Sequence, residues 1–292
     1  MKGTTLLRAL LCTLPLMLPS YVAVAEEPKP PRGFPHAFFA FDNGTGRGEF
    51  PPETQAKMLK ELGYDGIGYT GATGIPEILA ALDKYRLKLF SIYVGAFVGP
   101  EGPSYDPGLA TAIEQLKGRD TVIWLTIQGT AENGDEQAVQ VVRQVGVLAE
   151  KAKLRVALYP HVGFYVAQVE DALKIVKQVN RPNVGASFNL CHWLRAGDEP
   201  NMKLRMEQSR PHLFLVSING ADHEGGWDRL IQTLGRGEFD VYAFVRTLHE
   251  TGYTGPIGLQ CYNVRGDRRE NLSRSIAAWK AFCERRAKEL RE

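Results

Sequence analysis

Eight short apolar runs recur along the chain, and a segment with helical periodicity follows each of them. The runs span residues 38–41, 66–70, 88–93, 122–127, 155–159, 184–188, 213–218 and 256–260. The clearest helical patterns span residues 52–62, 75–85, 136–151, 168–179, 241–251 and 271–284, and weaker ones span 109–116 and 202–209. Strands joined by helices run parallel with right-handed crossovers. Eight such units in about 250 residues predict an α/β fold that closes as a (β/α)8 barrel, the TIM barrel architecture.

An open, doubly wound sheet is the alternative arrangement of the same units. Such sheets carry a three-glycine fingerprint on the first strand-to-helix turn. The segment 42–48, DNGTGRG, spaces its glycines two residues apart without the third in place. We interpret it as a flexible loop after the first strand, with a phosphate cradle as the weaker interpretation.

The N-terminal residues 1–25 have the pattern of a secretory signal peptide. Lys2 and Arg8 precede an apolar run over residues 9–17, and Ala23-Val24-Ala25 supplies a cleavage site of small residues. An uncleaved anchor is disfavoured because the run is shorter than the roughly 20 residues that span a bilayer. We therefore expect a periplasmic or secreted protein with no stable membrane insertion after cleavage. Residues 26–37 are interpreted as a proline-rich linker, and residues 38–292 as one barrel domain.

The composition limits the classes of partner that the chain could bind and the number of disulfides that it could form. The chain has 292 residues, is 44% hydrophobic, and balances 35 Lys and Arg against 33 Asp and Glu. This excludes a disordered chain and gives no basic footprint for nucleic acid. Cys191, Cys261 and Cys283 remain after the predicted cleavage. Cys191 and Cys261 both follow predicted strand ends and could pair, but buried free thiols are the favoured interpretation.

The chemistry of such a barrel lies at the carboxyl ends of its strands, so the polar residues that follow each run form the candidate site. These are Asp42 and Asn43, Tyr69 and Thr70, Tyr93, Thr126 and Gln128, Tyr159 and His161, Asn189 and His192, Ser217, Asn219 and Asp222, and Gln260 and Tyr262. Amides, hydroxyls and aromatic rings dominate the set, as in sites that hold a polyol. We expect a small-molecule carbohydrate ligand, bound by Tyr69, Tyr159, Asn189, Asn219, Asp222 and Gln260.

The loops after the sixth and seventh strands add a cation and two indoles to this face. Arg236, between two glycines, is expected to clamp an anionic or keto group, or alternatively to pair with Glu238 or Asp240. Trp193 and Trp227 could stack on a sugar ring, although packing under a loop is the commoner use of tryptophan.

Three stretches of the sequence resemble the xylose-isomerase-like TIM barrels, a family that includes sugar phosphate isomerases and epimerases. The first stretch includes LGRGEFD at 234–240, Leu248, GY at 252–253 and GPIGL at 255–259. The second is ELGYDGI at 61–67, and the third is VGASFNLCH at 184–192. The resemblance covers essentially the whole predicted barrel. It implies the fold more specifically than it implies a reaction.

Members of that family commonly hold a divalent metal with a glutamate, an aspartate, a histidine and a glutamate at the ends of strands five to eight. By the same resemblance, Tyr159, Asn189, Ser217 and Gln260 occupy these positions here. A hard dication is held mainly by carboxylate charge, and neutral groups cannot replace it. The sequence thus leaves a divalent metal possible but removes the usual carboxylate ligands.

His161 and His192 remain as the side chains that can move protons at neutral pH. We expect them to be the catalytic residues, with hydrogen bonding to a sugar hydroxyl as the alternative role. A nitrogen-rich metal site formed by His161, His192 and Asp222 is a further alternative.

These observations predict an exported sugar isomerase- or epimerase-like enzyme, or a lyase, that abstracts a proton next to a carbonyl. The alternative is a non-catalytic carbohydrate-binding barrel that has lost its metal site. The sequence indicates no particular sugar and no particular oligomeric state.

Overall fold

The computed structural model describes Met1 and residues 33–292, so all of the predicted signal peptide except Met1, and most of the predicted linker, lie outside the described residues. The strands are β1 (Phe38–Phe41), β2 (Gly66–Thr70), β3 (Lys88–Val98), β4 (Ser104–Tyr105), β5 (Val122–Gly129), β6 (Arg155–Leu158), β7 (Val184–Asn189), β8 (Leu213–Ile218) and β9 (Ile257–Leu259). All except β4 pair in parallel in the order β2-β1-β9-β8-β7-β6-β5-β3, and a pairing of β2 with β3 closes the ring. The predicted eight-stranded barrel is confirmed, and an open sheet is excluded.

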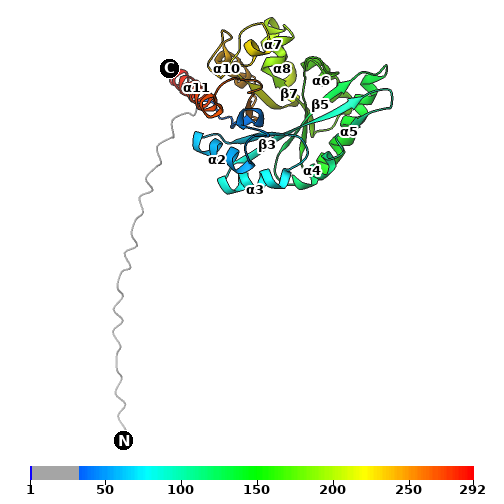
Figure 1. Cartoon of the computed structure of the whole chain (residues 1–292), viewed down its shortest axis with the longest axis horizontal. Coiled ribbons are helices and arrows are strands. Elements are labelled where there is room, and N and C mark those ends of the chain that lie inside the picture. Colours follow the sequence, from blue (N-terminus) through cyan, green and yellow to red (C-terminus); the bar gives the residue numbers. More distant parts are fainter. Residues whose placement is uncertain (2–32) are drawn as a thin grey trace. The chain divides into compact units, whose positions relative to one another are not determined.

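Helices follow the strands and pack around their outside (Figure 1). They are α1 (Asp42–Thr45), α2 (Pro52–Leu62), α3 (Ile75–Tyr85), α4 (Leu109–Gln115), α5 (Gly134–Lys151), α6 (Val169–Val179), α7 (Leu190–Arg195), α8 (Met202–Ser209), α9 (Trp227–Leu230), α10 (Val241–Glu250) and α11 (Arg268–Glu289), with 3-10 turns at Glu199–Asn201 and Arg210–His212.

Capping residues in the local sequence fix where two of these helices begin. At α6, Gln168 and Asp171 form a reciprocal capping box, and at α10 the Asp240 side chain accepts the backbone N–H of Ala243.

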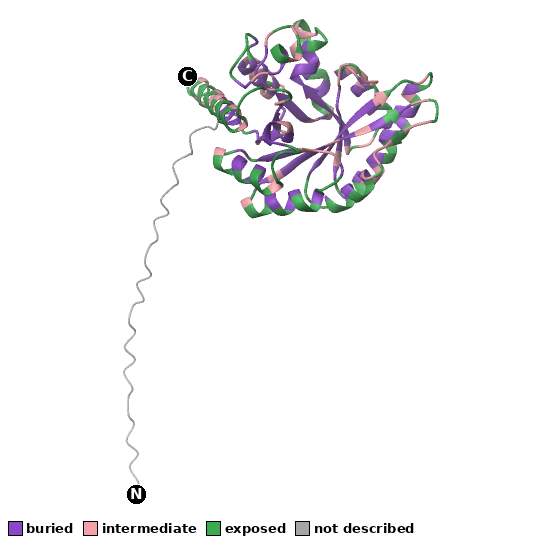
Figure 2. Ribbon diagram, viewed as in Figure 1, coloured by how far each residue is buried: buried purple, intermediate pink, exposed green. Residues whose placement is uncertain are grey.

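Strand alternation divides the interior into two cores. On β1, Phe38 and Ala40 face the helices and join the large outer core, whereas Phe39 and Phe41 point into the barrel. Trp124 on β5 belongs to the same inner core. Figure 2 shows the consequence: the strands are largely buried, and the helices are buried mainly on the side that faces them.

Two glycines make room for the rings inside the barrel. Gly68 on β2 pairs with Phe41, and Gly258 on β9 pairs with Phe39. A Cβ atom on Gly68 would lie 2.4 Å from the ring of Phe41, and one on Gly258 would lie within 2.7 Å of both rings. Any side chain at either position would therefore displace the aromatic filling of the barrel.

The structure differs from the sequence-based expectations in three places. Strand β3 continues to Val98 and forms a hairpin with β4. The segment predicted as a flexible loop after β1 begins with the short, largely buried helix α1. The packed part of the chain also begins before the predicted boundary at residue 38, because Phe34 and His36 are buried against Tyr242, His249 and Trp279.

The three cysteines of the described region are free thiols, so Cys191 and Cys261 do not pair. Burial raises the pKa of each of these two thiols to about 12, which keeps them protonated and unreactive at neutral pH. Among the described residues, no helix has both the length and the hydrophobicity needed to cross a bilayer.

Candidate functional site

A cavity of about 290 Å³ opens at the carboxyl ends of the barrel strands. Its walls combine aromatic rings, uncharged polar groups, two imidazoles and one guanidinium. The lining residues are Phe41, Asn43, Arg47, Thr70, Tyr93, Trp124, Tyr159, His161, His192, Trp227, Ile231, Gln260 and Tyr262. The volume is close to the lower limit for small-molecule sites, so the cavity fits a compact ligand.

Stacked rings form the floor of the cavity. Tyr159 lies parallel to Trp124, with ring centroids 4.0 Å apart and planes 1° apart. Phe41 stacks on Trp124 at 4.6 Å. The indole N–H of Trp124 donates to Oγ of Ser187 at 2.7 Å, which satisfies the one polar atom of that side chain. The floor is therefore apolar and closely packed.

His161 and His192 lie side by side on one wall, with ring centroids 3.9 Å apart. Val162 contacts both rings. Its carbonyl oxygen lies 2.9 Å from Nδ1 of His161, which must carry a proton to make this hydrogen bond. Its backbone N–H donates to Nδ1 of His192 at 3.3 Å, so that nitrogen must be unprotonated. Neutral His161 thus has its lone pair on Nε2, whereas neutral His192 has its proton there.

A tight turn places these contacts. The backbone N–H of Phe164 donates to the carbonyl of His161 at 2.9 Å, and Gly163 adopts φ +91° at the third position of the turn. That conformation favours glycine. The His161–Phe164 sequence therefore specifies the turn that holds the two imidazoles together.

Burial lowers the pKa of both histidines. It lowers the pKa of His192 to about 3, and the neighbouring His161 acts on that pKa in the same direction. The pKa of His161 is also lowered by burial, although its hydrogen bond to Val162 opposes this. Both rings are therefore neutral at pH 7, as the two tautomers require.

Gln260 and Asn43 form a polar patch across the mouth. Oε1 of Gln260 accepts hydrogen bonds from the side-chain amide of Asn43 and from the backbone N–H groups of Cys261 and Tyr262. These three donors fix the orientation of the amide. Thr70 lies beside this patch at the end of β2. The patch can donate to and accept from sugar hydroxyls.

Of the nine residues that the sequence assigned a binding or catalytic role, four line the cavity: Tyr159, His161, His192 and Gln260. The other five do not. Tyr69 packs against the outer core. The Asn189 amide donates to the carbonyl of Pro160 at 3.2 Å and accepts from Ser217 at 3.1 Å, so it braces the strands beside the cavity.

The other three lie in or at the start of the connection between β8 and α10. The Asn219 amide donates to the Leu230 carbonyl at 2.7 Å, inside that connection. Asp222 binds Nε of Arg229 at 2.8 Å and the backbone N–H of Glu238 at 3.0 Å, and it is not beside the histidines. Arg236 is exposed and is not part of the cavity wall.

Sequence reasoning missed several lining residues. Arg47 lies in the glycine-rich segment after β1. Trp124 lies within an apolar run, where only the alternation of strand side chains could indicate that it faces the interior of the barrel. Of the two tryptophans that were expected in loops, Trp227 begins α9 and lines the cavity. Trp193 instead packs against Phe188 and Phe244 in the outer core.

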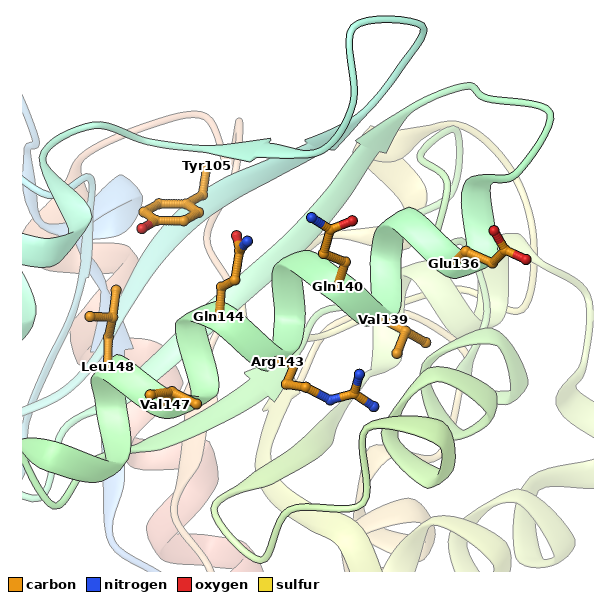
Figure 3. A pocket seen from close by; sticks show the side chains of 8 residues that line it. All are labelled: Tyr105, Glu136, Val139, Gln140, Arg143, Gln144, Val147 and Leu148. Carbon is orange, nitrogen blue, oxygen red and sulfur yellow. The ribbon is translucent and has the colours of Figure 1, made fainter.

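A larger groove of about 570 Å³ lies on the outside of the barrel, between Tyr105 of β4 and one side of α5 (Figure 3). Its wall consists of Tyr105 and side chains of a single helix, among them Gln140, Arg143 and Gln144. Among the described residues, no histidine or cysteine lines it. The cavity at the strand ends is therefore the candidate active site.

A family model described as "Xylose isomerase-like TIM barrel" matches residues 56–282. The chain belongs to this family. No curated protein gives a significant match. Among solved structures, 3-keto-D-glucoside 4-epimerase from E. coli is 17% identical, with 85% of this chain and 100% of that chain covered at a TM-score of 0.67.

Two further solved structures have the same architecture. D-allulose 3-epimerase from Methylomonas sp. in complex with D-allulose is 16% identical, covering 86% of this chain and 98% of that chain at a TM-score of 0.67. The IOLI protein with a binding zinc atom is 17% identical, covering 85% of this chain and 98% of that chain at a TM-score of 0.67. At these identities the likeness shows the fold.

The residues at the metal positions expected from the family do not fit a hard dication. Tyr159, Asn189, Ser217 and Gln260 each lie within one residue of the ends of β6 to β9, and none of them carries a charge. Tyr159 is moreover held in the aromatic floor, and burial raises the pKa of its hydroxyl well above the ordinary value. In the described part of the chain, no three His, Cys, Asp or Glu side chains gather closely enough to hold a metal ion.

Proposed function

We propose that the chain is a sugar isomerase- or epimerase-like enzyme in which the His161–His192 pair moves a proton next to a carbonyl without the carboxylate-bound metal of its family. The complementary tautomers of the two imidazoles carry the proposal. Membership of the xylose isomerase-like family, and the sugar epimerases with the same fold, support a carbohydrate substrate.

The aromatic floor and the amide patch bind and orient the sugar. Ring faces of Tyr159 and Trp227 stack on the apolar side of a pyranose or an open-chain sugar, while Asn43, Gln260 and Thr70 exchange hydrogen bonds with its hydroxyls. The rigid floor excludes water from one side of the ligand. In these surroundings of low dielectric constant, each hydrogen bond to the substrate is electrostatically stronger than it would be in water.

Each histidine has one role in the proton transfer. Nε2 of His161 takes the proton from the carbon next to the carbonyl, and the electron pair of that C–H bond forms a C=C bond while the carbonyl oxygen gains negative charge. The Nε2–H of His192 donates to this oxygen and stabilises the enediolate. Return of the proton from Nε2 of His161 to the former carbonyl carbon, while the proton of the neighbouring hydroxyl moves to the enediolate oxygen, gives an isomer. An epimer forms when a water molecule on the face away from His161 protonates the original carbon and His161 passes the abstracted proton to the resulting hydroxide.

The low pKa of His192 suits the second role. An imidazole with a pKa of about 3 stays neutral at pH 7 and acts as a hydrogen-bond donor without becoming a cation. His161 is less completely buried and suits the role of base. The two rings are therefore not interchangeable.

A deuterium-exchange experiment tests the function. The purified chain is incubated in D2O with ketoses and oxidised glucosides, and NMR follows deuterium at the carbon next to the carbonyl. Exchange is expected in the wild type and reduced at least about hundredfold in His161→Gln, with thermal unfolding unchanged. His212→Gln, a histidine outside the cavity, is the control and retains exchange. Heat of sugar binding in calorimetry without exchange of any bound sugar contradicts an enzymatic role.

Export also belongs to the proposal. The basic, apolar and small-residue pattern of residues 1–25 supports cleavage after Ala25 and action outside the cytoplasm. Fractionation of cells, with N-terminal sequencing of the mature chain, checks this. A full-length N-terminus in the cytoplasmic fraction contradicts it.

A further inference from the structure

Arg47 is the one permanently charged side chain in the wall of the cavity within the described residues. No carboxylate of the described chain lines the cavity, and both imidazoles are neutral at pH 7. The Arg47 side chain is 45% exposed, so the guanidinium lies at the mouth and remains open to a ligand. A ligand that enters therefore meets a cation, and no carboxylate, among the described residues that line the cavity.

The nearest carboxylate, that of Asp42, forms only a long ion pair with this guanidinium. Asp42 is buried, and Thr70 binds both of its oxygens, with the backbone N–H at 2.7 Å from Oδ2 and the hydroxyl at 2.8 Å from Oδ1. The contact from Arg47 to Oδ1 is 3.5 Å, at the limit of a hydrogen bond. No other hydrogen bond of the Arg47 side chain is found in the described part of the chain. Four of the five N–H donors of a guanidinium are thus left for an anion.

Arg47 and the histidine pair lie on opposite sides of the barrel. Arg47 contacts the Asp42–Thr70 pair at the ends of β1 and β2. His192 follows β7, which is four strands away from β2 in the closed ring of eight. A ligand that contacts both must cross the cavity. Its anionic group is then remote from the carbon that loses the proton.

We propose that the substrate is an anionic sugar, whose carboxylate or phosphate is held by Arg47 while the carbon next to its carbonyl lies at the histidine pair. This inference rests on the proposed function and adds the chemical class of the substrate. It also replaces Arg236, for which the sequence analysis weighed this role against an ion pair, as the anion-binding residue. A planar guanidinium at this position gives two parallel hydrogen bonds to either kind of oxyanion.

Calorimetry with matched sugars tests this proposal on the full chain. Glucose, glucuronate and glucose 6-phosphate share a ring and differ in the group at the remote carbon. At least one anion is expected to bind at least about tenfold more tightly than glucose, and which one it is distinguishes a carboxylate from a phosphate substrate. The preference is expected to disappear in Arg47→Gln, to weaken with added salt, and to persist in Arg236→Gln, the exposed control.

The possible failures are distinguishable. Equal binding of all three sugars, or an anion preference that survives in Arg47→Gln, overturns the assignment of Arg47 while leaving sugar binding intact. Absence of binding by every sugar, neutral or anionic, together with absence of deuterium exchange, overturns the proposed function itself.

Discussion

Phe164 stacks on His161, with ring centroids 3.9 Å apart and planes 12° apart. The same two residues close the turn through a backbone hydrogen bond of 2.9 Å. The base of the proposed reaction is thus held by its own turn from one side and by His192 from the other. Small changes in this turn should therefore affect the reaction more than they affect the fold.

Gly163→Ala is expected to reduce deuterium exchange about tenfold while changing sugar affinity little, because a misplaced base harms the reaction more than binding. The φ of +91° costs an alanine about 1 kcal/mol. Gly118→Ala is the matched control: Gly118 also has positive φ and open space around it, but it lies before β5, away from the cavity. Equal losses of exchange in the two variants would rule out a positioning role for the turn.

The pH dependence of exchange should follow the lowered pKa values of the histidine pair. A base whose pKa is lowered in the folded protein stays unprotonated as the pH falls, so activity is lost only when the pH passes through the lowered pKa. We expect a level rate between about pH 8 and pH 6.5, the ordinary pKa of histidine, and a decline below it. Measurement of kcat/KM against pH checks this. A half-maximal rate above pH 6.5 would contradict the neutral pair.

Trp124→Ala is expected to lower the free energy of unfolding by about 3–5 kcal/mol, because it empties the centre of the inner core. Chemical denaturation measures the loss. Trp227→Ala, at the half-buried rim of the same cavity, is expected to cost less than about 1 kcal/mol. Similar losses in the two variants would contradict the expectation that the aromatic floor contributes more to stability than the rim does.

Stability should fall on mild acidification because of His36. Burial lowers its pKa to about 4, against the effect of its hydrogen bond to the Gly255 carbonyl, and the adjacent His249 lowers it as well. The unfolded chain then binds more protons than the folded chain between pH 6.5 and about pH 4, so stability is present above 6.5 and is lost as the pH falls. His36 should account for about 2 kcal/mol between about pH 7 and pH 5. Denaturation at both pH values should show a smaller loss in His36→Gln, but an unchanged loss in His212→Gln.

Removal of divalent metal should leave exchange unchanged. The neutral side chains at the strand ends cannot supply the charge that holds a hard dication. Exchange rates before and after treatment with a chelator, and after addition of Mn²⁺ or Zn²⁺, test this. Loss on chelation with recovery on addition of metal would show that side chains other than Tyr159, Asn189, Ser217 and Gln260 supply the ligands of a metal site.

The barrel itself could be predicted from the sequence because its strands are short apolar runs between turn residues. The bounds of β1 and β2 were predicted to the residue. The extension of β3 to Val98 was not predicted, because these residues are strand residues through their pairing with β5, which lies further along the chain. Phe34 and His36 were assigned to a linker for a similar reason: their partners Tyr242, His249 and Trp279 lie in the last quarter of the chain.

The strand-end rule located part of the site. It works for Tyr159, His161 and Gln260, which lie one to three residues past their strands. It fails at Tyr69, because alternation turns Thr70 inward and its neighbour outward. Long connections defeat it as well: Asp222 is tied to Arg229 within its own loop, which no spacing in the sequence reveals.

The parallel stack of Trp124 and Tyr159 limits how this barrel could acquire a larger substrate. The rings that line the candidate site are the same rings that fill the barrel. A substitution that deepened the pocket would remove packing from the most confined part of the molecule. Substitutions that change specificity without loss of core packing are therefore expected at the rim. Arg47, Trp227 and Tyr262 are examples of such positions.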